Sequence, residues 1–218
     1  MNALVDPRPL DSPWPRLAPM HTHPVLTGQW VTMSVVDPSR DGRELFDALD
    51  EDVVWTHLAG RPETPEAFIR LLQERLDSGW IPWVVRSHDD RLGVEAKSII
   101  GMTSYLDISV EDARLEIGWT AYAPRVWGTQ ANPECKFLLL AHAFDELQAG
   151  RVQLKTDIRN ERSQRAIAGI GANFEGVLRR YQRRTDDTVR DTVMYSVTSE
   201  DWPRVRTHLR SRIGGSQA

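Results

Sequence analysis

The chain has 218 residues and a formal net charge of −4, with 27 Lys and Arg against 31 Asp and Glu. This length is sufficient to bury a core without disulfides or metals, and the presence of one cysteine excludes an intramolecular disulfide and fits a reducing compartment. No apolar run approaches the roughly 18 residues that span a bilayer, and the N-terminal region lacks the apolar centre of a signal peptide. We therefore expect a cytoplasmic protein with no membrane partner.

The charges are distributed unevenly along the chain. Residues 1–150 carry 13 Lys plus Arg and 23 Asp plus Glu, whereas residues 151–190 carry 10 and 5. A local basic segment indicates either a small anionic ligand or basic surface strands, because extended nucleic acid normally meets a broad positive face. We expect no nucleic-acid partner, and binding of RNA or DNA through the arginines at 179–184 is kept as an alternative.

Residues 1–24 are predicted to form an N-terminal arm. They contain six prolines, which exclude both a continuous helix and a central strand. The arm is either disordered or packs through Trp14 and Leu17 on its own domain or on a second subunit, so a homodimer is one of the alternatives.

The rest of the chain predicts one α+β domain at residues 25–200, followed by a short C-terminal helix and tail at 201–218. Apolar periodicity and turn residues predict strands at 26–36, 81–87, 98–109, 113–122, 151–157, 174–184 and 189–198, and helices at 41–49, 65–78, 133–147, 161–171 and 200–212. Consecutive strands early and alternating elements later favour a mixed central sheet of about seven strands flanked by helices.

The stretch from Arg125 to Leu147 contains a turn-forming loop that leads into a helix. Asn132 is a suitable N-cap, Pro133 suits the first helical position, and Glu134 adds negative charge to the first turn. Helical spacing recurs in the apolar residues Phe137, Leu140, Ala141 and Phe144. A loop that feeds the free N–H groups of a helix start can bind phosphate, and a capped amphipathic helix without a ligand is the alternative.

Two longer segments carry a family resemblance. They are EIGWTAYAPRVWGTQANPECKFLLLAHAFDEL at 116–147 and RVQLKTDIRNERSQRAIAGIGANFEGVLRR at 151–180, and together they resemble the GNAT N-acetyltransferases, in particular the RimJ/RimL-like branch. The resemblance implies a GNAT fold, acetyl-CoA as co-substrate, no metal, and transfer of an acetyl group to a primary amine of a protein N-terminus or a small molecule. The alternatives are transfer of another acyl group such as succinyl, or a catalytically inactive CoA-binding sensor or interaction module.

The resemblance also implies a cofactor loop. In this family the loop has Arg or Gln, two residues, Gly, one residue, and Gly or Ala, and its backbone N–H groups hold the coenzyme A pyrophosphate. Arg125 and Gly128 match, but Gln130 stands at the last position, so its side chain must point away or make a contact of its own. The residues expected to bind the cofactor are Trp119, Thr120, Arg125, Val126, Trp127, Gly128, Thr129, Gln130, Ala131, Asn132, Lys136, Asn160 and Ser163.

Glu116 is the candidate general base. An ammonium group must lose a proton before or during attack on a thioester, and burial beside Leu115 and Ile117 would raise the pKa of Glu116 toward a useful value. A structural glutamate paired with an arginine fits the same pattern. His57 is the second candidate if the base lies on the acceptor side.

Ser163, three residues after Asn160, is by resemblance the candidate general acid for the departing thiolate. Tyr181 and Tyr195 are the alternatives, since many enzymes of this family use a tyrosine. An acyl-enzyme intermediate on Cys135 is not expected, because no His-based triad surrounds this residue.

Three side chains bracket the second predicted helix. Trp55, His57 and Trp80 either fill the core or line the acceptor pocket, because loops carry much of an enzyme's specificity. A backbone N–H near Trp119 or Thr120 is expected to stabilise the oxyanion of the reaction.

Overall fold

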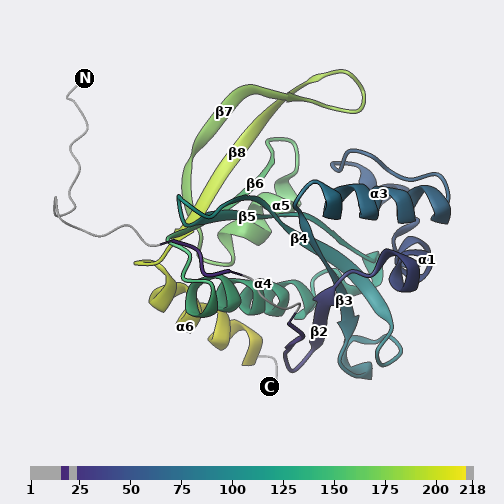
Figure 1. Cartoon of the computed structure of the whole chain (residues 1–218), viewed down its shortest axis with the longest axis horizontal. Coiled ribbons are helices and arrows are strands. Elements are labelled where there is room, and N and C mark those ends of the chain that lie inside the picture. The colour runs from purple at the N-terminus through teal and green to yellow at the C-terminus, as the bar shows by residue number, and fades with distance from the viewer. Residues whose placement is uncertain (1–15, 20–23, 215–218) are drawn as a thin grey trace.

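A computed structural model of the chain describes residues 16–19 and 24–214, which build a mixed sheet with helices on both faces (Figure 1). The strands are β1 (Leu26–Thr27), β2 (Val31–Val35), β3 (Ile81–Ser87), β4 (Ile99–Ser109), β5 (Arg114–Tyr122), β6 (Arg151–Asp157), β7 (Asn173–Arg183) and β8 (Val189–Thr198). Their order in the sheet is β1-β2-β3-β4-β5-β6-β8-β7, and β5 and β6 are the parallel pair among antiparallel neighbours.

Helices cover the sheet in two groups. The helices are α1 (Pro38–Leu49), α2 (Asp52–Trp55), α3 (Pro65–Asp77), α4 (Ala131–Ala141), α5 (Glu161–Ala168) and α6 (Trp202–Gly214), with single turns η1 (Asp90–Leu92), η2 (Pro124–Val126) and the π-helical η3 (His142–Glu146). In Figure 1, α4 and α6 lie side by side under one face, and α1 and α3 lie together toward the other. Each group has its own apolar cluster, which explains why several strands are buried on both faces.

The predicted α+β architecture is confirmed, with eight strands in place of about seven. The extra strand arises because the predicted strand 26–36 is divided into β1 and β2 by a turn. Glu134 of α4 stabilises this turn, since its buried carboxylate accepts the N–H groups of Gln29, Trp30 and Val31 at 2.8, 2.6 and 2.8 Å.

The start of α4 differs from the prediction. The helix begins at Ala131, and Gln130 occupies the N-cap position without a side-chain bond, so Asn132 lies in the first turn and is not the cap. Thr129 Oγ1 instead accepts the N–H of Ala131 at 3.3 Å. The predicted apolar face is also rotated, because Phe137 is only partly buried beside Trp202 of α6, with ring centroids 6.3 Å apart.

Two predicted helix starts are confirmed. Thr64 Oγ1 accepts the N–H of Ala67 at 3.1 Å at the start of α3, and Asn160 Oδ1 accepts the N–H of Ser163 at 3.0 Å at the start of α5. These local side-chain caps fix the directions in which both helices leave the sheet.

Part of the predicted arm packs on its own domain. Leu17 is 6% exposed in the larger core cluster, its N–H donates to Val110, and the N–H of Ala18 donates to Leu147. Trp14 lies outside the described residues. Among residues 16–19 and 24–214, no helix is long and apolar enough to cross a membrane.

The sheet opens between β5 and β6. These strands pair only through residues 114–116 of β5 and 151–153 of β6. Beyond this point β5 carries a bulge opposite Thr103, where Trp119 has a φ of +45° and neither Trp119 nor Thr120 has a partner in the β4 ladder. Bulges of this kind redirect side chains and free backbone groups, so the bulge and the splay create the opening in which the candidate site lies.

Candidate active site

A cavity of about 550 Å³ occupies the opening between β5 and β6, a volume suited to a small-molecule ligand. Its floor comes from β5, β6 and Lys136. We call the lining from the loop before α4, from Asn132 of α4 and from α5 the α4–α5 wall, which includes Val126, Trp127, Gly128, Asn132, Asn160, Arg162 and Ser163. We call the lining from α2, α3, their flanking loops and the β7–β8 hairpin the α3–hairpin wall, which includes Val54, His57, Leu58, Arg75, Trp80, Gln182 and Arg190.

Most of the residues predicted to bind the cofactor line this one cavity. They are Trp119, Thr120, Val126, Trp127, Gly128, Asn132, Lys136, Asn160 and Ser163. Four others, Arg125, Thr129, Gln130 and Ala131, are outside its lining. The guanidinium of Arg125 donates to the carbonyl of Ile99 at 3.3 Å, and Thr129 is used by the helix start.

The loop before α4 turns at Gly128. This residue has a φ of +76°, and a Cβ placed on it would meet no atom within 4 Å. Backbone conformation, and not lack of space, therefore favours glycine here. The turn directs the loop into the start of α4, where free N–H groups and the helix dipole favour an anion.

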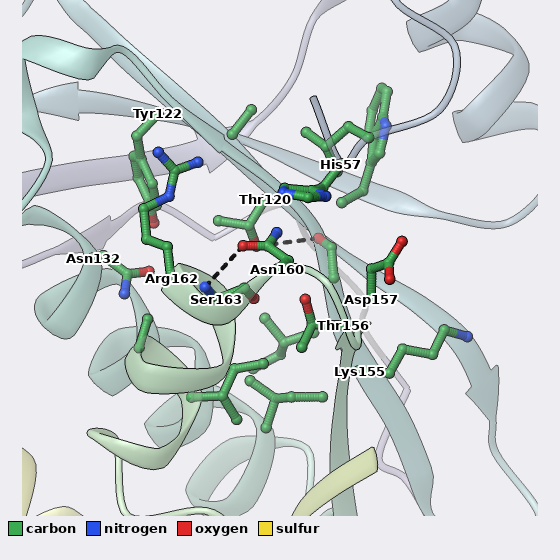
Figure 2. A pocket seen from close by; sticks show the side chains of 18 of the residues that line it. His57, Thr120, Tyr122, Asn132, Lys155, Thr156, Asp157, Asn160, Arg162 and Ser163 are labelled. Atoms are coloured by element: carbon green, nitrogen blue, oxygen red, sulfur yellow. Dashed lines mark hydrogen bonds between the residues drawn. The ribbon is translucent and has the colours of Figure 1, made fainter. Parts of the chain in front are cut away.

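The start of α5 completes this wall. Figure 2 shows Asn160, Arg162 and Ser163 together at the pocket, with the Asn160 cap bond to Ser163 drawn as a dashed line. The guanidinium carbon of Arg162 lies 3.5 Å from the ring centroid of Trp127, so the two segments of the wall are joined by a cation–π contact.

Glu116 lies in the floor and is 2% exposed. Lys155 Nζ lies 2.8 Å from its carboxylate, and Gln153 Nε2 donates to it at 3.2 Å. Burial raises the pKa of Glu116, and the charge of Lys155 opposes this rise. The structure thus combines both sequence interpretations, because the carboxylate is ion-paired, with a lysine in place of the arginine, and it also faces the pocket.

Lys136 is a second charged group in the floor, and it is 4% exposed. Its Nζ donates to Thr103 Oγ1 at 3.2 Å and to Thr120 Oγ1 at 2.9 Å. No carboxylate among the described residues lies within ion-pair distance, and burial lowers the pKa of Lys136 to about 8. The side chain therefore supports the β5 bulge through neutral hydroxyl partners.

The candidate proton donors are separated by their positions. Ser163 lines the cavity, whereas Tyr181 is 46% exposed and Tyr195 is buried, and neither lines it. Tyr122, which the sequence did not single out, lines the cavity, and its buried Oη has no hydrogen-bond partner in the described part of the chain. Cys135 is fully buried, and burial raises the pKa of its thiol to about 12, which disfavours a nucleophilic thiolate.

The three predicted acceptor residues have different positions. His57 and Trp80 line the cavity, and burial is the main cause that lowers the pKa of His57. Trp55 is 6% exposed in the second core cluster, where its Nε1 donates to the carbonyl of Leu49 at 2.8 Å and its ring packs edge-on against Phe68. Trp55 thus fills core space, as one of the two sequence interpretations held.

Several charged lining residues were not predicted. Arg162 lies in the sequence NERS at 160–163, next to Ser163, and this neighbourhood could have indicated that it lines the pocket. Arg75, Asp157 and Arg190 come from three separate elements and carry no local sequence signal. Among residues 16–19 and 24–214, no group of three or more His, Cys, Asp or Glu side chains could hold a metal ion.

Comparisons with known proteins identify the family of the chain. Residues 34–173 match the family described as acetyltransferase (GNAT) domain. The structure is similar to that of a protein from T. thermophilus assigned to the acetyltransferases, with 36% identity, a TM-score of 0.76, and coverage of 89% of this chain and 100% of the other.

Two further solved structures share the fold. A GCN5-related N-acetyltransferase from Brucella melitensis has 22% identity, a TM-score of 0.82, and coverage of 91% and 89% of the two chains. Mycobacterium smegmatis RimJ, in complex with CoA-disulfide, has 18% identity, a TM-score of 0.69, and coverage of 84% and 88%. A comparison with curated proteins found no significant match. The family match and the shared fold show that this chain belongs to the GNAT acetyltransferase family and is an acyl-CoA-dependent N-acyltransferase.

Proposed function

We propose that the protein transfers an acetyl group from acetyl-CoA to a primary amine by direct attack, as a member of the RimJ/RimL-like branch. The observation that carries this proposal is the position of Glu116, a buried carboxylate with a raised pKa in the floor of a pocket that also contains the loop before α4 and the start of α5. A carboxylate in this state can accept a proton near neutral pH.

The α4–α5 wall supports the assignment of the donor end. Gly128, Asn132 and the start of α4 offer backbone N–H groups for the pyrophosphate, and Asn160 of α5 would meet the pantetheine arm. Arg162 adds a positive charge beside them. The solved RimJ complex with CoA-disulfide agrees with a CoA ligand in this fold.

The floor supports the chemical steps. Glu116, directly or through one water molecule, takes a proton from the ammonium of the acceptor, and the neutral nitrogen attacks the thioester carbonyl. The oxyanion accepts a hydrogen bond from the backbone N–H of Trp119 or Thr120, which the bulge leaves outside the ladder. The attacking nitrogen of this intermediate carries one excess proton. The C–S bond then breaks, Ser163 gives its proton to the thiolate, and the excess proton of the nitrogen, passed directly or through water, replaces the proton that Ser163 gave up.

The test is thiol release from acetyl-CoA with a panel of peptide N-termini and small amines. Glu116→Gln should lower kcat/KM by about 10²-fold or more while CoA affinity, measured by calorimetry, is unchanged. Ser163→Ala should lower kcat by a smaller factor. Glu175→Gln is the matched control, because this glutamate is also paired with a basic side chain, Arg151, but lies outside the pocket.

Two outcomes would redirect the proposal. CoA binding without turnover of any amine by the wild-type protein would favour the sensor or interaction module. Faster turnover with succinyl-CoA than with acetyl-CoA would change the acyl group and leave the attack mechanism intact.

A further inference from the structure

Arg75 has an unusual environment in the α3–hairpin wall. It lies in the last turn of α3 and lines the cavity, with its guanidinium carbon 4.6 Å from the ring centroid of Trp80 and 5.8 Å from that of Trp119. Its Nε is buried without a hydrogen-bond partner, and no hydrogen bond or ion pair engages its terminal nitrogens among the described residues. Stacking on the two indoles and the position at the C-terminal end of α3 explain why the protein tolerates a cation here. They do not explain why the N–H donors of the guanidinium make no hydrogen bonds.

The pocket as a whole carries an excess of positive charge. Its charged lining residues are Arg75, Lys136, Lys155, Arg162 and Arg190 against Glu116 and Asp157. Both carboxylates are already paired, Glu116 with Lys155 and Asp157 with Arg184. Three arginines in the lining therefore have no carboxylate partner in the described part of the chain. An acceptor that brought only positive charge would be repelled by this field.

The surplus is shared between the two walls. Arg162 stacks on Trp127 in the α4–α5 wall, where the proposed function places the cofactor phosphates. Arg75 and Arg190 belong to the α3–hairpin wall, whose hairpin projects from the sheet on the same side as α3 in Figure 1. Arg190 Nε donates to Thr192 Oγ1 at 3.1 Å, so it is partly satisfied. The Nε of Arg75 is closed off from solvent, so its terminal Nη groups are the donors left for a ligand.

We propose that the acceptor amine also carries a carboxylate, and that Arg75, held by Trp80 and Trp119, binds this carboxylate. A planar guanidinium offers paired donors that match a carboxylate, and flanking indoles strengthen such a bond by excluding water. The inference rests on the proposed function and specifies its acceptor as an amino acid or an acidic peptide. Polyamines and other polycationic amines are disfavoured acceptors.

The kinetic test uses matched amines that differ only in the group at the far end. Series of increasing chain length carry a carboxylate, a phosphonate, a carboxamide or a second amine, and each is assayed by thiol release from acetyl-CoA. At the chain length that gives the highest activity, kcat/KM for the carboxylate should exceed that for the carboxamide by about tenfold or more, as a charge-assisted hydrogen bond predicts. The diamine should have the lowest kcat/KM. A preference for the phosphonate, the carboxamide or the diamine would overturn the proposal.

Variants of α3 locate the effect. Arg75→Gln should bring the ratio of kcat/KM between the carboxylate and the carboxamide close to one, mainly through loss of activity toward the carboxylate, while the affinity for CoA is unchanged. Arg75→Lys should restore part of the preference for the carboxylate. Arg70→Gln is the control, because Arg70 is an exposed residue of the same helix outside the pocket. An equal loss for all acceptors in Arg75→Gln would instead indicate a structural role and overturn the proposal.

A binding measurement separates this inference from the proposed function. The CoA-loaded protein is titrated by calorimetry with N-acetyl amino acids and with their carboxamides, which requires no turnover. Tighter binding of the carboxylate, lost in Arg75→Gln, would support the inference even if no amine were acetylated. Equal binding of both compounds would overturn it even if acetyl transfer were established.

Discussion

The two walls of the pocket are built in different ways. The α4–α5 wall consists of a glycine turn and two helix starts, and its named residues come from two short segments, 126–132 and 160–163. The α3–hairpin wall brings His57, Arg75, Trp80 and Arg190 together from elements far apart in the chain. A binding site made of backbone groups suits a ligand that a whole family shares. A binding site made of side chains from separate elements can be altered by single substitutions. The sequence pattern therefore specifies the α4–α5 wall, to which we assign the donor, far better than the α3–hairpin wall, to which we assign the acceptor.

The floor between the walls contains a second contrast. Lys136 contacts two threonine hydroxyls, whereas Lys155 contacts the carboxylate of Glu116. A buried charge with neutral partners is costly, and a buried charge with an opposite charge is compensated in part. The two lysines should therefore respond differently to substitution, one through stability and the other through catalysis.

The largest expected effect is on folding stability and involves Lys136→Met. The pKa of Lys136 is lowered from 10.5 to about 8, so the unfolded chain binds more protons between these values and the penalty of the buried charge is full below pH 8. The penalty is relieved as the pH rises from 8 to 10.5. The free energy of unfolding of the methionine variant relative to wild type should thus fall by about 3 kcal/mol across this range.

Urea unfolding at pH 7 and at pH 10.5 measures this difference. Lys97→Met serves as the control, because Lys97 is exposed and its substitution should give a pH-independent difference. If the difference in unfolding free energy between Lys136→Met and wild type did not vary with pH, burial would not lower the pKa of Lys136 in the folded protein.

The next effect is on catalysis and involves Lys155→Met. Burial raises the pKa of Glu116 and Lys155 lowers it, so loss of the lysine should raise this pKa further. A general base must be unprotonated, and the acidic limb of the kcat/KM profile should therefore move to higher pH. A shift of about one pH unit would lower kcat/KM about tenfold on the acidic side.

The pH–rate profiles of wild type and Lys155→Met decide this point, with Lys97→Met again as the control. An unmoved acidic limb would mean that another group, such as His57, titrates in the limb. That result would assign the role of general base to the α3–hairpin wall. It would also weaken the contrast between Lys136 and Lys155 in the floor.

Much of the fold could be predicted because it depends on local patterns. The helix starts at residues 65 and 161 were predicted, and Thr64 and Asn160 cap these helices, while the alternation in the strands marks the sheet. Two features were missed, the first because it depends on a distant residue and the second because a neighbouring residue competes for the cap. The turn between β1 and β2 is held by Glu134 about a hundred residues away, and the start of α4 is set by Thr129 and not by Asn132.

The candidate site divides in the same way. Glu116, Gly128 and Ser163 were predicted from segments that resemble a family, and all three line the pocket. Arg75 was not predicted, because an arginine in the last turn of a helix is commonly a favourable interaction with the helix end. Its place in the cavity lining and its two indole neighbours, Trp80 and Trp119, become visible only in the folded chain.

The smallest expected effect tests the donor end through Gly128→Ala. Gly128 has a φ of +76° and Gly93, in the turn between β3 and β4, has a φ of +74°, and a Cβ on either residue would meet no atom within 4 Å. Both alanine variants should therefore lose a similar stability of about 1 kcal/mol from the left-handed backbone alone. If the Gly128 loop holds the pyrophosphate, only Gly128→Ala should also weaken CoA binding, by a few-fold in calorimetry. The reason is that the strained turn would move the N–H groups that contact the phosphate. Equal CoA affinity in the two variants would place the phosphates elsewhere and would remove the contrast between a backbone-built donor end and a side-chain-built acceptor end.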